Sequence, residues 1–245
     1  MKRIAIFCVS YNSDKERDHY LASIKQAAQK ASDQVQVEVF VANNTKDNNP
    51  GYFGAIQQMM KDVDVMTYDY SIISNVDMEL NEDFFCRLAD YPCESTTGWI
   101  APQIYSHLEE RDRNPKILQR YSAKKLQILK TLYQFPILDT LYTHTLYHSK
   151  KYQHHEAGPI YAGHGSLIIL TKHYFEVCGK IDYPVFLFCE EIYLAECCRQ
   201  HQLTVRYEPS IRVTDTEHAS TGQMPHRLYC RYNYEAISYI LQKYY

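Results

Sequence analysis

The sequence predicts an α/β protein with an open, mainly parallel sheet that carries helices on both faces. Over the first hundred residues, apolar runs of strand length alternate with segments of helical periodicity, which is the order of parallel strands joined by crossover helices. Polar residues directly follow three of these apolar runs. In such sheets ligands bind beyond the carboxyl ends of the strands, so the same pattern predicts where a site would lie.

Four strands are expected in the amino-terminal half. The compact apolar run RIAIFCVS predicts a buried parallel strand, and the following SDKE predicts a capping box between Ser13 and Glu16. Apolar residues then continue at helical spacing from Tyr20 to Ala31. The alternating run VQVEVFVA predicts the second strand, YSIIS the third and GWIAPQ the fourth.

The remaining segments predict further helices and strands. The segment NNPGYFGAIQQMMKDV predicts a loop that runs into a helix, and NEDFFCRLADY predicts a helix capped by Asn81. After residue 157, IYAGHGSLIIL predicts a strand that begins with glycines, and TKHYFEVCG predicts a short helix that Gly179 ends. FLFCEEIYLAECCRQHQ predicts a turn that becomes a helix, LTVRYEP a strand, and HRLYCRYNYEAISYILQKYY a helix rich in tyrosine.

Composition narrows the class of protein. The 245 residues are 45% hydrophobic and 22% charged, as in a folded domain with a core, and the net charge of -3 argues against a general nucleic-acid binder. No apolar run approaches the roughly 18 residues of a membrane span, and the amino terminus reads as a strand rather than a signal peptide. The eight cysteines show no CxxC or zinc-finger spacing, so we expect free thiols in a reducing, cytoplasmic setting.

Residues 103–157 interrupt the regular pattern. Between Arg113 and Lys151 there are eight Lys or Arg residues and a single acid, Asp139, with apolar and aromatic residues interleaved. The stretch SAKKLQILKTLYQF predicts a basic amphipathic helix. Such a helix either packs on its own domain or rests on an anionic bilayer, and the sequence leaves both alternatives open.

The end of the third strand offers the first candidate site residues. Asp77 follows YSIIS, and a carboxylate just past a strand end can bind a hard divalent cation together with diphosphate oxygens. Asn75 points to the same side as Asp77 if strand geometry continues, so its amide could hydrogen-bond a nucleoside. A polar turn that caps the next helix is the alternative interpretation of both residues.

A second pair of carboxylates, Glu190 and Glu191, follows the apolar stretch PVFLFC. Apolar surroundings raise a carboxyl pKa toward the range of a general base, whereas favourable charge at a helix N-terminus is the alternative. His218 lies in the late polar loop TDTEHAS and could ligate a metal or donate to a phosphate, ahead of His164 and of the cluster at 154–156.

The order of these pieces carries a family resemblance. The pieces are VSYNS at the first strand end, NNPGYFGAIQQ, NVDMEL, and the block from YAGHGSLIIL through IDYPVFLFCEEIYL to TDTEHAS. In this order they resemble the family-2 glycosyltransferases of GT-A fold, and most closely the rhamnosyltransferase-like branch. The resemblance spans residues 3–102 and 159–235, and residues 103–157 match nothing in it.

The resemblance implies a fold and a division of the chain. It implies one GT-A domain over 1–245, with a mixed, mainly parallel sheet flanked by helices. Its parts would be a nucleotide-sugar-binding half, a variable insertion, an acceptor and catalytic half, and a C-terminal helix, at 1–102, 103–157, 158–223 and 224–245 respectively.

The resemblance also implies roles for individual residues. The residues that match donor and nucleotide contacts are Ser10, Tyr11, Asn12, Asn44, Asn49, Gly51, Asn75 and Asp77. Asp77 matches the last acid of the DxD motif and, with His218, implies bound Mn²⁺ or Mg²⁺. Glu191, beside Glu190, matches the Asp of the ED pair that is the proposed general base, although it is one methylene longer. The residues expected on the acceptor side are Gly163, His164 and Gly165, whose glycines either admit substrate close to the backbone or serve a bulge.

The implied function is an inverting glycosyltransferase of the hexosyltransferase type. It would move a sugar from a UDP- or dTDP-sugar to a hydroxyl of a saccharide acceptor, lipid-linked, in bacterial surface polysaccharide synthesis. Residues 113–151 would then rest on the inner face of the cell membrane. One alternative is a catalytically impaired sugar-nucleotide-binding subunit. Another is a sugar-1-phosphate nucleotidyltransferase, but that class needs a glycine-rich loop after the first strand, and SYNSDKERDHY contains no glycine.

Overall fold

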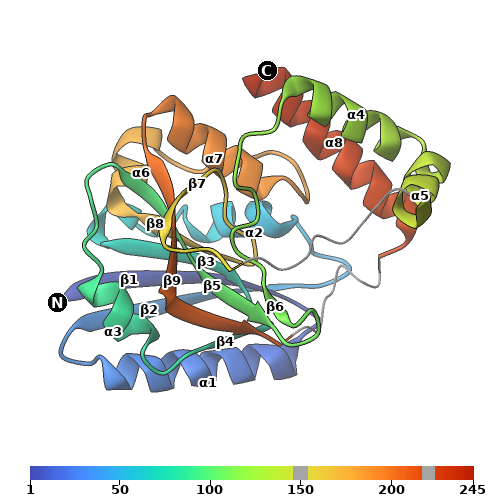
Figure 1. The fold of residues 1–245 in the computed structure, drawn as a ribbon. Coiled ribbons are helices and arrows are strands. Elements are labelled where there is room, and N and C mark those ends of the chain that lie inside the picture. Colours follow the sequence, from blue (N-terminus) through green and yellow to red (C-terminus); the bar gives the residue numbers. More distant parts are fainter. Residues whose placement is uncertain (146–153, 217–223) are drawn as a thin grey trace.

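The computed structural model describes residues 1–145, 154–216 and 224–245, and Figure 1 shows the order of its elements. The strands are β1 (Lys2–Tyr11), β2 (Val35–Asn44), β3 (Tyr70–Asn75), β4 (Met78–Leu80), β5 (Thr97–Ser106), β6 (Arg111–Asp112), β7 (Gly158–Ile160), β8 (Leu167–Thr171) and β9 (Thr204–Asp215). The helices are α1 (Asp14–Lys30), α2 (Tyr52–Met59), α3 (Phe84–Asp90), α4 (Ala123–Gln134), α5 (Pro136–Thr145), α6 (Lys172–Cys178), α7 (Glu190–Gln200) and α8 (His226–Tyr244), with a 3-10 turn at Val65–Thr67.

Within these residues, nine strands form one sheet in the order β2-β1-β3-β8-β5-β9-β4, with β6 beside β5 and β7 beside β9. The longest pairings, β1 with β2, β1 with β3 and β5 with β9, are parallel. Strand β8 runs antiparallel between β3 and β5, and the short strands β4, β6 and β7 also pair antiparallel. The predicted fold class, a mixed and mainly parallel sheet with helices on both faces, is confirmed.

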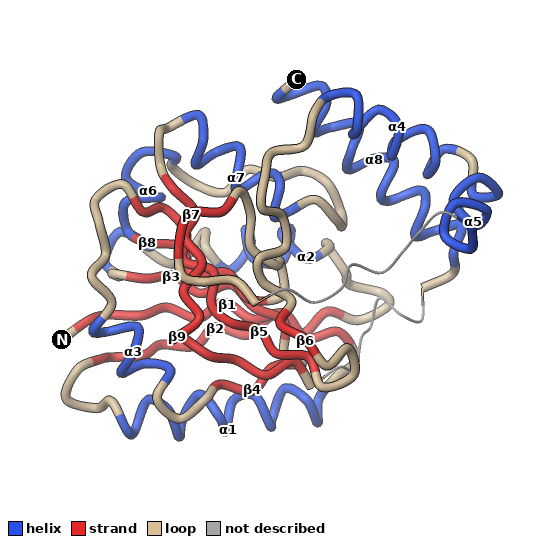
Figure 2. Tube along the Cα trace, in the orientation of Figure 1, coloured by secondary structure: helices blue, strands red, loops and turns tan. Residues whose placement is uncertain are grey.

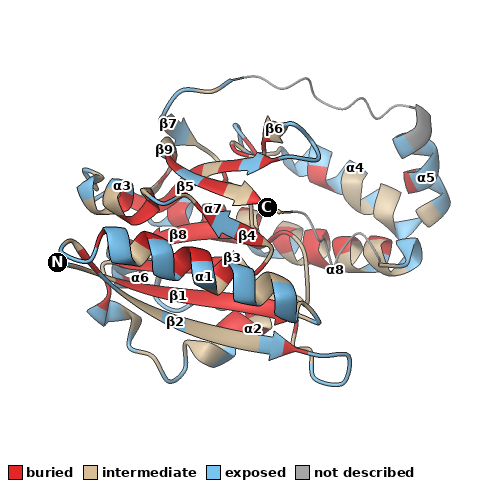
Figure 3. Cartoon of the chain, turned by 90° about the horizontal axis from the view of Figure 1, so that it is seen from below, coloured by how far each residue is buried: buried red, intermediate tan, exposed pale blue. Residues whose placement is uncertain are grey.

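Helices cover both faces of the sheet because the central strands are apolar on both sides. In β1, Ile4 and Ile6 pack with α1 and α3, whereas Ala5 and Phe7 pack with α2, α6 and α7 on the opposite face. Figure 3, viewed from below, shows the central strands buried along their length and α1 exposed on its outer side. This two-sided burial fixes the positions of the strand ends, where the candidate site residues lie.

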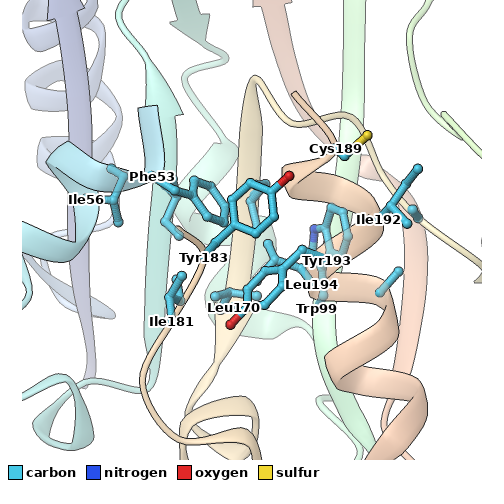
Figure 4. Close-up of a cluster of buried hydrophobic side chains, with 14 of the residues drawn as sticks. Phe53, Ile56, Trp99, Leu170, Ile181, Tyr183, Cys189, Ile192, Tyr193 and Leu194 are labelled. Atoms are coloured by element: carbon cyan, nitrogen blue, oxygen red, sulfur yellow. The ribbon is translucent and has the colours of Figure 1, made fainter. Parts of the chain in front are cut away.

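An aromatic cluster joins α2 and α7 across the second face of the sheet (Figure 4). The ring of Tyr183 lies between Phe53 of α2, at a centroid distance of 6.0 Å, and Tyr193 of α7, at 4.9 Å. Trp99 of β5 is fully buried in the same cluster. Burying rings of this size contributes a large part of the hydrophobic stabilisation, so α2 and α7 are held in a fixed relation.

Helices α4, α5 and α8 form a separate layer, here called the helical annex, beside the sheet (Figure 2). The expected amphipathic helix is present as α4, and its N-terminus is capped by Ser122, whose hydroxyl accepts from the Lys125 amide at 3.2 Å. Leu126 is fully buried against α8, but Ile128 on the outer side is 52% exposed. Helix α4 therefore packs on its own chain and still presents apolar side chains to solvent.

Three local predictions are wrong. Ser13 precedes α1, but its hydroxyl donates to the carbonyl of Tyr11 at 2.9 Å and forms no capping box with Glu16. Helix α3 begins at Phe84 after Asp83 rather than at Asn81, because Met78–Leu80 forms a strand paired with β9. The glycine-led strand is divided into β7 and β8, which lie against different neighbours in the sheet.

All eight cysteines are free thiols, as expected. In the part of the chain that the structure describes, no helix combines the length and the apolar character that crossing a bilayer would require.

Candidate active site

The carboxyl ends of three strands lie side by side. Tyr11 at the end of β1 is opposite Asn44 at the end of β2, and Asn75 at the end of β3 is opposite Val9. The hydroxyl oxygen of Ser10 is buried and has no hydrogen-bond partner among the described residues. The sheet register thus brings together three of the polar strand ends that the sequence predicted to form a nucleotide site.

Asn44 continues this edge into the loop before α2. Its side-chain amide donates to Oδ1 of Asn49 at 3.1 Å, and the same oxygen accepts the Gly51 amide at 3.0 Å. Asn12, just past β1, adopts a left-handed conformation with φ 51°, which asparagine tolerates better than most residues. These bonds hold the Asn49 loop in a fixed conformation beside the strand ends.

Gly51 joins the loop after β2 to the turn before α7. It has a φ of +86°, and a Cβ atom added there would lie 2.1 Å from the carbonyl oxygen of Phe186. The neighbouring amide of Tyr52 donates to that same oxygen at 3.3 Å. Only glycine fits a position that combines positive φ with backbone contact this close.

Tyr52 extends this connection and was not among the residues predicted from sequence. Its hydroxyl donates to the carbonyl of Gly165 at 3.1 Å. Burial, followed by the charges of Glu190 and Asp77 among others, holds the pKa of Tyr52 well above its ordinary value, so the hydroxyl stays protonated. The only sequence signal for it is its place directly after Gly51, since the chain has 23 tyrosines.

Asp77 lies in the short link between β3 and β4. Its carbonyl accepts the Thr216 amide at 3.0 Å, and its carboxylate oxygen Oδ1 is buried. The charge of Asp77 contributes to raising the pKa values of Tyr20 and Tyr52 after burial, which places the carboxylate near both hydroxyls. His218, two residues beyond Thr216, lies outside the described residues.

The donors near Asp77 fit a hard divalent cation. Asp77 offers carboxylate oxygens, and Asn75, two residues earlier, offers an amide. Mn²⁺ and Mg²⁺ in nucleotide sites commonly use one or two carboxylates and take their other ligands from phosphates and water, so one acid suffices. The second acid nearby, Asp215, forms an ion pair with Arg113 and is already neutralised.

Glu190 and Glu191 sit at the start of α7 and have different surroundings. Burial, and then the charge of Glu191, raises the pKa of Glu190 to about 8. Its Oε1 has no hydrogen-bond partner among the described residues. Glu191 is less buried, and its Oε2 lies 3.8 Å from where a Cβ atom on Gly165 would be. At neutral pH Glu190 is therefore mostly protonated. The Glu191 carboxylate faces Gly165, where no side chain fills the space.

The turn that delivers these two acids is strained. Phe188 and Cys189 both have positive φ, 74° and 61°, a conformation that a bulky residue rarely adopts. The carbonyl of Phe188 is held by the Tyr183 hydroxyl at 2.6 Å. Strain of this kind costs about 1–3 kcal/mol per residue and is concentrated at functional sites in proteins, which motivates a functional interpretation of the turn.

The three residues expected on the acceptor side have different surroundings. A Cβ atom on Gly163 would lie 2.7 Å from Ala101 and 2.9 Å from Trp99, so this glycine is needed for packing. Gly165 has open space except towards Glu191. His164 accepts or donates through Nδ1 to Ser166 at 2.8 Å, depending on its tautomer.

His164 also lies beside a group of cations. Burial, followed by the charges of Lys116, Arg113 and Arg111, holds its pKa well below the ordinary value, so the ring is neutral at pH 7. The group arises from β6 and the segment after it, which the sequence placed in the unmatched insertion. Arg111 and Arg113 form ion pairs with Glu109 and Asp215, which compensate much of this positive charge.

No protein-family model matches the chain, and no curated protein matches it either. Solved structures do match. GalNAc-T7, crystallised with UDP, GalNAc and Mn²⁺, matches with a TM-score of 0.60 and 12% identity, over 98% of this chain and 48% of that chain. S. aureus TarS matches with a TM-score of 0.51 and 10% identity, over 89% of this chain and 37% of that chain.

A Drosophila β-1,4-galactosyltransferase 7 mutant in complex with manganese, UDP-Gal and xylobiose matches with a TM-score of 0.49 and 14% identity, over 89% of this chain and 68% of that one. Because this TM-score is below 0.5, we infer nothing from the match. The chain spans about half the length of the GalNAc-T7 chain and just over a third of TarS. The matches to these two establish that the chain has the GT-A fold that the sequence resemblance implied. At such identities the likeness speaks to the fold alone.

Proposed function

We propose that the chain is an inverting glycosyltransferase that uses a nucleoside-diphosphate sugar. The observation that carries the proposal is the connection made by Gly51 and Tyr52. Tyr52 donates to the Phe186 carbonyl through its amide and to the Gly165 carbonyl through its hydroxyl, while Gly51 packs directly against the Phe186 backbone. These contacts hold the polar strand ends against the turn that carries Glu191. A sugar donor bound at the strand ends and an acceptor bound beside Glu191 would then meet near Gly51 and Tyr52.

The donor nucleotide lies along the strand ends in this proposal. Asn44 and Asn49 fix the loop that flanks the nucleoside, and the buried Ser10 hydroxyl, which has no hydrogen-bond partner among the described residues, lies at the same strand ends. A divalent cation, Mn²⁺ or Mg²⁺, would be held by Asp77 and would neutralise charge on the diphosphate. His218 remains the proposed further ligand.

Glu191 is the general base in this proposal, and Glu190 is not. Glu191 removes the proton from the acceptor hydroxyl, whose oxygen forms a bond to the anomeric carbon while the bond from that carbon to the diphosphate breaks. The electron pair of that bond leaves with the diphosphate. A base must be ionised at the working pH, and Glu190, with a pKa of about 8, is mostly protonated at neutral pH. The protonated acid can instead donate a hydrogen bond.

Gly165 leaves room for the acceptor next to Glu191. With no side chain there, a saccharide hydroxyl can approach the carboxylate from the Gly165 side. The proposed acceptor is lipid-linked, in bacterial surface polysaccharide synthesis, with the donor a UDP- or dTDP-sugar. The assignment to the rhamnosyltransferase-like branch rests on the sequence resemblance.

The helical annex supports the membrane part of this proposal. Large apolar side chains that are exposed on or before α4 and α5 are Leu118, Ile128, Phe135, Ile137, Leu138 and Leu141. Lys124 of α4 is exposed on the same helix as Ile128. Exposed apolar and basic side chains on adjoining helices are typical of surfaces that rest on anionic bilayers.

The proposal is tested by measuring the melting temperature with UDP, dTDP, GDP and CMP, each with and without Mn²⁺. We expect UDP or dTDP to raise it, by an amount that corresponds to about 2.7 kcal/mol at a ligand concentration 100 times the Kd. Dependence of this rise on Mn²⁺, and its loss in Asp77→Asn, would support the assignment of Asp77. A flat response to every nucleotide would contradict the proposed donor class.

A further inference from the structure

We propose that Asp139, His226 and Cys230 form a second metal site, which takes a divalent cation of the zinc type and joins α5 to the first turn of α8. The three ligand atoms face one another within 4.8 Å. The proposal does not depend on the glycosyltransferase assignment. Asp77 lies beside the sheet, whereas these residues lie on α5 and α8 of the helical annex (Figure 1).

The distances between the ligand atoms suit tetrahedral coordination. With bonds of about 2.3 Å to sulfur and about 2.0 Å to nitrogen and oxygen, tetrahedral zinc ligands lie roughly 3.3–3.6 Å apart. The Cys230 sulfur lies 3.5 Å from Nε2 of His226 and 3.8 Å from Oδ2 of Asp139. The remaining separation, Nε2 to Oδ2, is 2.8 Å, a hydrogen-bonded distance that a metal would widen slightly.

The same geometry argues against a cysteine–histidine–aspartate catalytic triad. In a triad the two ring nitrogens of the histidine have different partners, one facing the nucleophile and the other the acid. Here both Cys230 and Asp139 approach the single atom Nε2 of His226. An imidazole nitrogen, a thiol and a carboxylate that all face one another are typical of a metal-ligand set. They do not form the linear chain of hydrogen bonds that a proton relay needs.

Helix geometry explains why the sequence brings these atoms together. His226 and Cys230 are four residues apart and so lie on one face of α8, one turn apart. Asp139, the single acid between Arg113 and Lys151, sits in the first turn of α5. Because His226 and Cys230 are four residues apart and the third ligand comes from another helix, a search for CxxC or zinc-finger spacing does not find this site.

Burial leaves one coordination position open. Cys230 is fully buried and the Asp139 side chain is only 12% exposed, whereas the His226 side chain is 48% exposed. Three protein ligands with solvent on the histidine side leave room for water as the fourth ligand. The cation can therefore enter from solvent, and its expected role is to stabilise the packing of α5 on α8.

The test is a cobalt titration of the full metal-free chain, read by thiolate-to-cobalt charge-transfer absorption. The proposal predicts absorption that saturates at one Co²⁺ per chain and is displaced by Zn²⁺. Cys230→Ala should abolish it. His226→Ala alters an exposed side chain and should weaken Co²⁺ binding by at least about 10–100-fold, since even outer partners of metal ligands have effects of that size.

The matched control is Cys197→Ala. Cys197 contributes, after burial, to raising the pKa values of Cys178 and Cys198, so these three thiols lie near one another and are the competing source of thiolate. Cys197→Ala should leave the cobalt absorption unchanged. Absence of the absorption in the unmodified chain would overturn the proposal, as would absorption that survives Cys230→Ala or disappears in Cys197→Ala.

Discussion

The sheet-borne site and the helical annex are held together by different interactions. At the strand ends, backbone hydrogen bonds of the parallel register fix Tyr11 beside Asn44 and Asn75 beside Val9. In the annex, contacts run through side chains, such as Lys130 over the Tyr234 ring at 5.2 Å. Helix α4 buries only Leu126 among its described residues.

In the proposed function, this difference separates a region that carries the chemistry from a region that docks on a surface. A backbone-fixed edge holds reacting groups to within the tolerances that catalysis needs. A layer that is joined through side chains and exposes apolar surface suits docking, where small shifts are tolerated. Changes in the first region should therefore remove turnover, and changes in the second should leave turnover intact.

The largest effect is expected for Glu191→Gln. Removal of a general base lowers turnover by about 10²–10⁴-fold, whereas nucleotide binding at the strand ends should persist. Turnover is measured by release of nucleoside diphosphate, and binding by thermal shift. The matched control is Glu190→Gln, which imitates the protonated state of Glu190 and should retain most turnover.

Two results would break this assignment. If Glu191→Gln turned over normally, the base would lie elsewhere, and a fully inactive Glu190→Gln would point to the buried neighbour. If the unmodified chain bound the nucleotide but transferred no sugar to any acceptor, a catalytically impaired binding subunit would be the better description.

The next effect is on stability, at Gly51. Gly51→Ala forces a side chain into positive φ and within 2.1 Å of the Phe186 carbonyl. We expect a loss of at least about 3 kcal/mol in the free energy of unfolding, because the backbone strain and the clash add. Gly158→Ala, with nothing within 4 Å of the added Cβ atom, is the control and should change little. Urea unfolding measures both, and equal effects would show that the Gly51 connection is not tight.

The fold could be predicted from sequence where the pattern is local. Apolar runs with polar ends located β1, β2 and β3 and the residues that follow them, because alternation and strand length are properties of a single segment. The Asn49–Gly51 loop was found through the family resemblance, and its hydrogen bonds agree with a fixed loop.

Non-local pairing could not be predicted in the same way. Insertion of β8 antiparallel between β3 and β5, and pairing of β4 with β9, depend on residues that are at least 69 positions apart in the sequence. Tyr52 was missed for a related reason, since its partner Gly165 is 113 residues away. The cations beside His164 lie in the insertion at 103–157, which the family resemblance does not cover, so they were not predicted.

The effect of pH on stability should come from Glu190. Its pKa rises from an ordinary value of 4.5 to about 8 in the folded chain. Because the folded state holds the proton more tightly, this stabilisation is complete below about pH 4.5 and is lost as the pH rises through 8. Between these values the free energy of unfolding should fall by up to about 1.4 kcal/mol per pH unit. Glu190→Gln should flatten this slope in urea unfolding, and an unchanged slope would assign it to another group.

The smallest effect is expected in the helical annex, where Ile128→Ser with Ile137→Ser tests the docking surface. These side chains are 52% and 83% exposed, so their replacement should not affect folding or turnover with a soluble acceptor. Retention on vesicles containing anionic lipid should fall by at least roughly thirtyfold, because each of the two isoleucines that enter the interface contributes about 1 kcal/mol or more.

The matched control is Leu108→Ser, which removes a side chain that is 81% exposed but lies in the turn after β5. If Leu108→Ser lowered retention equally, binding would reflect general apolar exposure rather than the annex. If the unmodified chain failed to bind vesicles at low salt, the annex would not be a membrane surface, yet the predictions for Glu191 and Gly51 would be unaffected. The strand-end site and the helical annex can therefore be tested separately. This is expected if the first carries out the chemistry and the second holds the protein where its acceptor lies.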